Sequence, residues 1–193
     1  MHAPPNCFVL AGGKSTRFGS NKSLAYIDER NMASVVANNM HIASGSAPRL
    51  IGADEHTSGA LGLLSIAGSR EGNGPLAALI DALEFADSGV VLIAPNDTPF
   101  FSSDCFIRLI ASLDTSQADV AVAVDSCDVT LVHWLLSAWR KDSCLATIQE
   151  QYLRGVRSVH EAVIGLQVTT VAYEASLVRN INRVSDLSQD GTI

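Results

Sequence analysis

The sequence predicts an α/β fold, a single domain built as a three-layer α/β/α sandwich around a mostly parallel sheet. Up to residue 124, apolar and β-branched runs alternate with segments of helical periodicity, which is typical of successive strand, helix and strand units. The chain has 193 residues, 47% hydrophobic and 17% charged, as in globular proteins. A chain of this length buries roughly 70% of the surface that it exposes when unfolded, so one core suffices.

The first predicted elements run from residue 7 to residue 67. The apolar run 7–10 predicts a buried strand, and a glycine-rich segment follows it directly. Residues 22–44 carry apolar side chains at mostly helical spacing, which predicts a helix across one face of the sheet. A second strand is expected over 49–52, and a third apolar run covers 61–67, where glycines crowd the pattern.

The clearest helix of the chain begins at Gly74 and Pro75. Proline fits the first helical turn, where its missing N–H costs nothing, and apolar residues recur with helical spacing after it. The continuous apolar run 90–94 predicts a central strand covered on both faces. Ser102 or Ser103 is expected to cap the next helix.

A strand is predicted over 120–124, and the alternation loosens after it. Here the sequence indicates a strand within 129–136, helices within 145–152 and 156–164, and a late strand over 167–173. Ligands in such sheets bind beyond the carboxyl ends of the strands, so we expect the site there.

Composition excludes several classes of function. The formal net charge of −7 would repel nucleic acid on average, which excludes a general DNA or RNA partner. No apolar run approaches the ~20 residues of a membrane span, and the first residues lack a basic segment before an apolar core. We therefore expect a cytoplasmic protein without a membrane partner. The four cysteines and five histidines form no zinc pattern, so reduced structural thiols are expected.

The most informative segment follows the first strand and combines three glycines with three cations. It reads Leu10-Ala11-Gly12-Gly13-Lys14-Ser15-Thr16-Arg17-Phe18-Gly19-Ser20-Asn21-Lys22. Paired glycines let the backbone approach a ligand closely, so that bare N–H groups can face phosphate oxygens. Lys14, Arg17 and Lys22 supply the positive charge. The segment predicts phosphate binding, with a glycine-rich turn carrying solvated lysines as the alternative.

Two familiar phosphate motifs do not fit this segment. A P-loop requires a glycine five residues before the glycine of Gly-Lys-Ser, and Phe8 occupies that position, inside the strand. A dinucleotide fingerprint requires G-x-G-x-x-G, whereas the glycines here stand at 12, 13 and 19. The segment therefore belongs to neither class, which leaves a nicotinamide dehydrogenase as the least favoured of the alternative functions.

The segment is similar to the signature L-A-G-G-x-S-x-R-M-G-x-D-K of the molybdenum cofactor guanylyltransferases, the MobA-like proteins. The spacing from Leu10 to Arg17 matches position by position, with Phe18 in place of methionine and Asn21 in place of aspartate. Relatives that transfer cytidylyl groups more often read Leu-Ala-Ala-Gly, so Gly12 favours guanine. The family implies a Rossmann-like sheet of the nucleotide-diphospho-sugar transferase type.

Three further segments carry the same resemblance. Residues 94–100 are similar to C-P-C-D-T-P-Y or P-C-D-M-P-F, in which the aspartate holds a metal. Asp97 by itself already suggests a hard oxygen ligand for Mg²⁺, rigidly aimed from a strand end, with an aspartate turn as the alternative. Residues 74–77 resemble G-P-L-A-G, and 180–187 resemble N-x-N-T-P-E-E-L, for which an Asx-turn before a helix capped by Ser185 is the alternative.

The resemblance implies that GMP passes from GTP to molybdopterin or the molybdenum cofactor and that pyrophosphate leaves. Arg17, Lys22 and Asp97 would be the catalytic residues, with Mg²⁺ on Asp97. The residues that would bind the nucleotide are Leu10, Ala11, Gly12, Gly13, Lys22 and Gly74. Asn180 and Asn182 would bind the acceptor. The single domain 1–193 would divide into a nucleotide-binding half, 1–124, and an acceptor-side half, 125–193, and a cofactor-delivery protein is a further partner that the resemblance suggests.

Several positions depart from the family pattern. The usual aspartate before G-P-L is absent, since residues 66–73 offer only Glu71. Gly52-Ala53-Asp54 replaces a turn richer in asparagine, and His133 lacks the proline of the usual His-Pro pair. These departures leave two alternatives open: a related transferase that uses CTP or a sugar phosphate, and a decayed protein that binds nucleotide without turnover.

Overall fold

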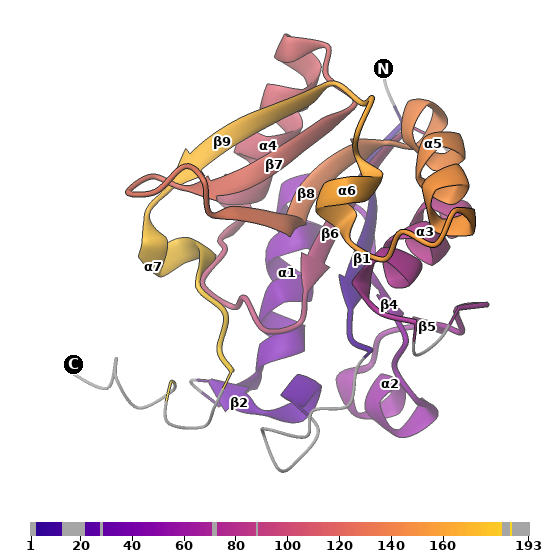
Figure 1. Ribbon diagram of the computed structural model, residues 1–193. Coiled ribbons are helices and arrows are strands. Elements are labelled where there is room, and N and C mark those ends of the chain that lie inside the picture. The colour runs from indigo at the N-terminus through magenta and orange to yellow at the C-terminus, as the bar shows by residue number, and fades with distance from the viewer. Residues whose placement is uncertain are drawn as a thin grey trace.

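The computed structural model describes residues 3–12, 22–27, 29–70, 73–87, 89–182 and 186. In this part of the chain, a seven-stranded sheet has the order β5-β4-β1-β6-β8-β7-β9 and lies between two layers of helices (Figure 1). Its strands are β1 Asn6–Leu10, β4 Arg49–Ile51, β5 Ser65–Ile66, β6 Val90–Pro95, β7 Val120–Asp125, β8 Val132–Arg140 and β9 Val168–Tyr173. The predicted three-layer α/β/α sandwich is confirmed.

Most neighbouring strands of the sheet are parallel, as the alternation of strands and helices predicts. β5, β4, β1 and β6 pair in parallel, and so do β7 and β9. β8 is the exception, because it runs antiparallel to both β6 and β7. The chain returns from β7 to β8 through the short segment 126–131, and only antiparallel neighbours can be joined by so short a connection. The strand predicted within 129–136 therefore exists, but it begins at Val132 and continues to Arg140.

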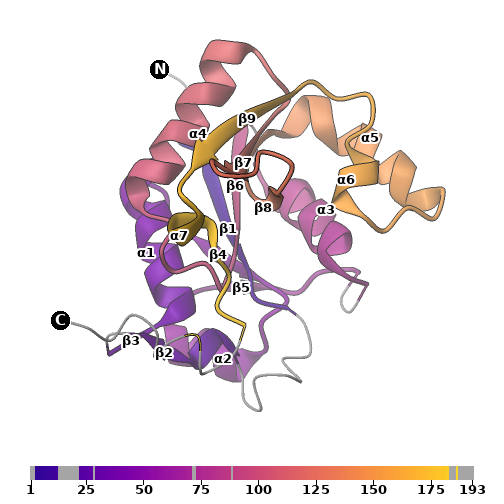
Figure 2. The same ribbon diagram turned by 60° about the vertical axis from the view of Figure 1, so that its left-hand side comes forward.

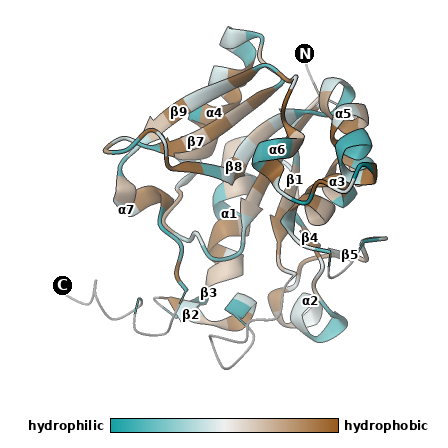
Figure 3. Ribbon diagram, in the orientation of Figure 1, coloured by the Kyte–Doolittle hydropathy of each residue, from teal (hydrophilic) through white to brown (hydrophobic). Residues whose placement is uncertain are grey.

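The two faces of the sheet are covered by different helices. Helices α1 (Met32–Ser44), α4 (Ser103–Ser116) and α7 (Ala175–Val178) lie on one side, and α3 (Pro75–Phe85), α5 (Lys141–Leu153) and α6 (Val159–Ala162) lie on the other (Figure 2). Alternate residues of β6 enter the two cores: Leu92 faces one, whereas Val91 and Ile93 face the other. This explains the continuous apolar run 90–94, and the central strands are largely brown in Figure 3.

The long helix predicted over 22–44 is shorter in the structure, because several elements divide this segment. It starts with the 3-10 turn η1 (Lys22–Leu24), continues through the strand pair β2 (Tyr26–Ile27) and β3 (Arg30–Asn31), and only then becomes α1. Asn31 fixes this arrangement, because its Nδ2 donates to the Leu24 carbonyl at 2.8 Å. The helical periodicity of the apolar residues belongs to α1 alone.

Between β4 and β5 the chain forms a helix that the periodicity did not predict. Helix α2 (Glu55–Leu61) is capped by Asp54, whose carboxylate accepts a hydrogen bond from the Thr57 N–H at 2.7 Å. The run 61–67 is therefore a helix end followed by the two-residue strand β5. Ser102 caps α4, as expected, by accepting from the Cys105 N–H.

The cysteines are all free, and three of them are buried. Burial raises the pKa of the Cys7 thiol to about 11 and that of Cys144 to about 12, so both are protonated at neutral pH. Cys7 and Cys144 are thus buried free thiols that pack within the two cores. No helix within the described ranges is long and apolar enough to span a bilayer.

A partly buried ionic cluster ties Arg70, which precedes α3 in the chain, to α3 and α5. The Arg70 guanidinium contacts Asp81 at 2.7 Å and Glu84 through two hydrogen bonds of 2.8 and 2.9 Å. Gln149 of α5 donates to Glu84 at 2.6 Å. The hydrogen bond from Arg70 holds the pKa of Glu84 below its usual range, so the carboxylate stays ionised. The cluster holds Arg70 against the second half of α3.

Gly68 packs directly against this cluster, because a Cβ at this position would overlap Oδ2 of Asp81. We expect Gly68→Ala to lower the free energy of unfolding by about 1–3 kcal/mol, since Asp81 would have to move away from Arg70. Thermal denaturation followed by circular dichroism measures the change.

Gly59→Ala is the matched control, because Gly59 lies in α2 with open space around its Cβ position. Alanine there is expected to stabilise the helix by about 0.5–1 kcal/mol. A Gly68→Ala variant as stable as this control would contradict the packing described.

Candidate functional site

The turns after β1 and β4 approach each other backbone to backbone at the carboxyl edge of the sheet. Gly52 has a φ of 78°, and a Cβ there would lie 2.9 Å from the Gly12 Cα. Glycine is required at position 52 for both reasons. From the sequence, Gly52 stands out only as part of the segment 52–54, which departs from the family pattern. The feature of the sequence that indicates its role is its position at the end of a short predicted strand.

The residues predicted to bind nucleotide are partly visible at this edge. Leu10 ends β1, and its carbonyl accepts from the Asn96 N–H at 3.1 Å. The Ala11 N–H donates to the Ile51 carbonyl at 2.9 Å, so this amide is engaged within the protein and would not itself contact a nucleotide. The following predicted positions lie outside the described residues: Gly13, Lys14, Arg17, Asn21, Glu71 and Ser185.

Four predicted site residues from distant parts of the chain meet in one polar cluster. Lys22 Nζ donates to Asp97 Oδ2 at 2.7 Å and to Asn182 Oδ1 at 2.9 Å. Asn180 Nδ2 donates to the other oxygen of Asp97, Oδ1, at 3.1 Å. The side chains of Lys22 and Asp97 are 14% and 13% exposed, so the ion pair is reachable yet largely shielded. We define these four residues as the Lys22–Asp97 cluster.

A tight turn after β6 holds Asp97 in place. The Asn96 N–H bonds to β1, and the buried Thr98 hydroxyl donates to the Pro95 carbonyl at 3.1 Å. Asn96 Nδ2 also donates to the Ser23 hydroxyl at 2.6 Å, which couples the turn to the segment that carries Lys22. These hydrogen bonds hold the segments that carry Lys22 and Asp97 next to each other. The short distance between Lys22 Nζ and Asp97 Oδ2 is therefore a consequence of the backbone arrangement.

The N-x-N spacing of residues 180–182 has a packing explanation. Ile181 is fully buried beside Met32, and its N–H donates to the Asp97 carbonyl at 2.8 Å. In an extended segment, alternate side chains point to opposite sides. With Ile181 anchored in the core, Asn180 turns toward Asp97 and Asn182 toward Lys22.

The donor set around Asp97 fits a metal that arrives with a phosphate ligand. Within the described ranges no group of three histidine, cysteine or acidic side chains could hold a metal ion. Mg²⁺ is commonly bound by one or two carboxylates together with substrate phosphates and water, and Asp97 supplies one such carboxylate. The residues therefore fit a magnesium–nucleotide complex better than a cage made of protein alone.

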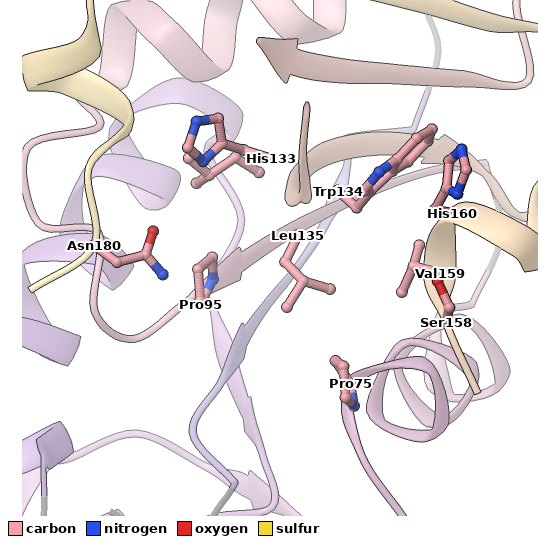
Figure 4. Close-up of a pocket in the computed structure, with 10 residues that line it drawn as sticks. Pro75, Pro95, His133, Trp134, Leu135, Ser158, Val159, His160 and Asn180 are labelled. Atoms are coloured by element: carbon pink, nitrogen blue, oxygen red, sulfur yellow. The ribbon is translucent and has the colours of Figure 1, made fainter. Parts of the chain in front are cut away.

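A cavity of about 320 Å³ adjoins the cluster on the side of β8 (Figure 4). Asn180 and Pro95 belong to its lining, so the cavity and the Lys22–Asp97 cluster share a wall. Pro75, at the start of α3, also lines it, directly after the predicted nucleotide ligand Gly74. Burial lowers the pKa of His133, another lining residue, which favours its neutral form. The sequence singled out His133 only for its missing proline.

The chain matches the MobA-like NTP transferase domain over residues 7–168. It is 33% identical to the probable molybdenum cofactor guanylyltransferase of Halalkalibacterium halodurans over 195 residues, which cover 94% of each chain. Among solved structures, molybdopterin-guanine dinucleotide biosynthesis protein A of Archaeoglobus fulgidus superposes with a TM-score of 0.75 at 20% identity, covering 94% of each chain.

A cytidylyltransferase has a similar fold. The 2-C-methyl-D-erythritol 4-phosphate cytidylyltransferase of Thermus thermophilus superposes with a TM-score of 0.67 at 16% identity, covering 95% of each chain. Both structural similarities concern the fold, and they confirm the predicted Rossmann-like architecture of nucleotidyltransferases.

The partly buried ion pair of Lys22 and Asp97 should make a measurable contribution to the free energy of unfolding. In a double-mutant cycle with Lys22→Met and Asp97→Asn, we expect a coupling free energy of about 1.5–3 kcal/mol, because a charge-assisted bond in a shielded site is only weakly screened. Chemical denaturation of the four proteins measures it.

The exposed pair Arg154 and Glu150, with side chains 65% and 62% exposed, provides the control cycle. Its coupling is expected to be about 0.3–0.5 kcal/mol. If the two cycles gave the same value, Lys22 and Asp97 would not form the shielded pair described.

Proposed function

The chain belongs to the family of MobA-like NTP transferase domains, and from that premise we propose that it transfers GMP from GTP to molybdopterin or the molybdenum cofactor. Membership makes it a nucleotidyltransferase. The choice of guanine and of this acceptor is supported by the guanylyltransferase relative, which is similar along nearly its whole length. The observation that carries the proposal is the meeting of Lys22, Asp97, Asn180 and Asn182 in one cluster.

In the proposed reaction, an oxygen of the terminal phosphate of the acceptor attacks the α-phosphorus of GTP. A new P–O bond forms there, the bond from the α-phosphorus to the bridging oxygen breaks, and pyrophosphate leaves with that oxygen. The nucleophile belongs to the substrate, so no side chain needs to form a covalent intermediate. The protein contributes alignment and charge stabilisation, which dominate such transfers.

Lys22 is the residue best suited to stabilise the charge that develops at the reacting phosphate. Its ammonium already lies against the Asp97 carboxylate and the Asn182 amide in a shielded position. A positive charge held in place before reaction costs no reorganisation when the phosphate becomes more negative. We assign Arg17 to the same phosphates by family resemblance, and Lys22 shares their binding.

Asp97 would hold Mg²⁺, which when bound supplies Lewis acid stabilisation of the phosphate oxygens. Asn180 donates to Asp97 and therefore orients its carboxylate. Asn180 and Asn182 are the members of the cluster that come from the part of the chain after residue 124, which supports an acceptor-side half over 125–193 of a single domain 1–193. Leu10, Ala11, Gly12, Gly13 and Gly74 are assigned to the nucleotide side, over 1–124.

The alternative nucleotide is CTP, because a cytidylyltransferase has a similar fold. The glycine at position 12 favours GTP, since the cytidylyl relatives more often carry alanine there. A thermal-shift panel with GTP, CTP, ATP and UTP in the presence of Mg²⁺ separates the two. Stabilisation by CTP greater than by GTP would overturn the guanylyl assignment.

We expect Lys22→Ala to lower the rate of transfer by two to three orders of magnitude, the effect of removing roughly 3–4 kcal/mol of transition-state stabilisation. Pyrophosphate release with GTP, Mg²⁺ and molybdopterin measures the rate. Arg154→Ala removes an equally charged but exposed side chain and should leave the rate unchanged. A Lys22→Ala enzyme as active as this control would remove Lys22 from the phosphate site.

Asp97→Ala is expected to abolish magnesium-dependent transfer while the protein stays folded, because the side chain lies at a strand end and outside the apolar cores. Turnover is measured across a magnesium titration, and folding by circular dichroism. The control is Asp87→Ala, which removes an exposed carboxylate elsewhere. Normal turnover of the Asp97 variant at saturating Mg²⁺ would exclude this residue as a metal ligand.

A further inference from the structure

Strand β8 is irregular next to the cavity described above. Its Ser137 pairs with Val122 of β7, but the next residue of β7, Ala123, pairs with His133. Residues 134–136 therefore have no partner in β7. Such irregularities turn side chains out of the regular alternation and are common beside functional sites.

A buried hydrogen-bond chain holds this irregularity in place. The indole N–H of Trp139 donates to the Ser137 hydroxyl at 2.7 Å, and that hydroxyl donates to the Trp134 carbonyl at 2.9 Å. Ser137 and Trp139 are both fully buried. A polar pair in such a position is stable only when its hydrogen bonds are made, so the conformation of residue 134 is strongly determined.

The irregularity brings Trp134 to the wall of the cavity. Its indole lies 5.6 Å from the His160 imidazole, between ring centroids, with the planes tilted by 50°. Figure 4 shows these two rings at one end of the cavity, His133 and Asn180 at the other, and Leu135 between them. The cavity is thus aromatic at one end and reaches the Lys22–Asp97 cluster at the other.

The side chains that line the cavity suit the ring system of a substrate better than its phosphate. None of the described residues around this cavity is acidic, lysine or arginine, so a phosphate would lose its hydration there without compensation. A flat, uncharged ring system with polar edges fits, because it can stack on the indole while His133, Ser158 and Asn180 offer hydrogen bonds.

The sheet order separates this cavity from the expected position of the nucleotide base. Gly12 and Gly52 approach each other after β1 and β4, whereas the cavity lies beyond β6, at β8. The Lys22–Asp97 cluster, after β6, lies between the two. A base on one side and a second ring on the other would both extend phosphates toward Lys22.

We propose that Trp134 determines the specificity for the acceptor by stacking on its flat ring system. This inference rests on the proposed function, since it assigns a position to the ring of the acceptor in that reaction. Asn180, shared by the cavity and the cluster, lies where the ring portion would join the phosphate portion. Ser137 is a positioning residue, because it acts through the conformation of Trp134.

The test measures binding of neopterin monophosphate, a pterin with a phosphorylated side chain, by titration calorimetry with Mg²⁺ present. We expect Trp134→Leu to weaken this binding about tenfold, within the range for loss of one ring stacked on an aromatic side chain. Trp134→Phe keeps an aromatic face and should bind within about threefold of the natural protein, as a partial loss of stacking area predicts. Glycerol 3-phosphate, which lacks a ring, should bind all three proteins equally.

Phe85→Leu is the matched control, because Phe85 is an exposed aromatic residue at the far end of α3 from Pro75. It should leave the affinity for the pterin unchanged. Equal pterin affinity of natural protein and Trp134→Leu would overturn the inference. So would a loss of GTP affinity in Trp134→Leu with pterin affinity kept, because the indole would then contact the guanine.

Turnover separates this inference from the proposed function. In the transfer reaction, Trp134→Leu should raise KM for the acceptor about tenfold with little change in kcat, as loss of a stacking contact predicts. If the natural protein bound the pterin through Trp134 but never released pyrophosphate from GTP, the proposed function would fail and the inference would stand. If it released pyrophosphate with an acceptor whose KM did not depend on Trp134, the inference would fail alone.

Discussion

The ion pair between Lys22 and Asp97 is the interaction on which the rest of the site depends. It joins two segments 75 residues apart in the chain, and it forms because β1 and β6 are neighbours in a parallel sheet. Parallel pairing brings the ends of both strands to one edge, where the segments that follow them must meet. Hydrogen bonds from Asn96 to Leu10 and to Ser23 then fix the two sides of the pair.

The same pair resolves an electrostatic difficulty. The chain carries a net charge of −7, yet its proposed substrates are strongly anionic, so the average field would repel them. In the cluster, one carboxylate faces one ammonium and two amides, which leaves a locally balanced site. Asp97 can serve a cation and Lys22 a phosphate without the cost of an isolated buried charge. The acidic surface elsewhere favours solubility and does not conflict with phosphate binding at this edge.

Polar and apolar recognition are separated along the carboxyl edge of the sheet. Backbone contacts of glycine lie at β1 and β4, charges lie after β6, and an aromatic cavity lies at β8. Two hydrogen-bonded clusters hold neighbouring segments in place: Arg70, Asp81 and Glu84 at the second half of α3, and the chain from Trp139 through Ser137 to Trp134. In each, a buried polar side chain, Asp81 or Ser137, is satisfied by hydrogen bonds, which stabilises the conformation that makes them.

Local patterns in the sequence predicted the fold class, the central strand 90–94 and a cap at Ser102 or Ser103, and the family resemblance pointed to Lys22, Asp97, Asn180 and Asn182, which the structure brings together. Short-range signals suffice there, because periodicity, capping and motif spacing act over a few residues. Tertiary structure alone decided the antiparallel direction of β8, the requirement for glycine at 52 and 68, and the position of Trp134. Each of these depends on atoms from segments far apart in the chain, and no local pattern encodes the distance at which two distant backbones meet.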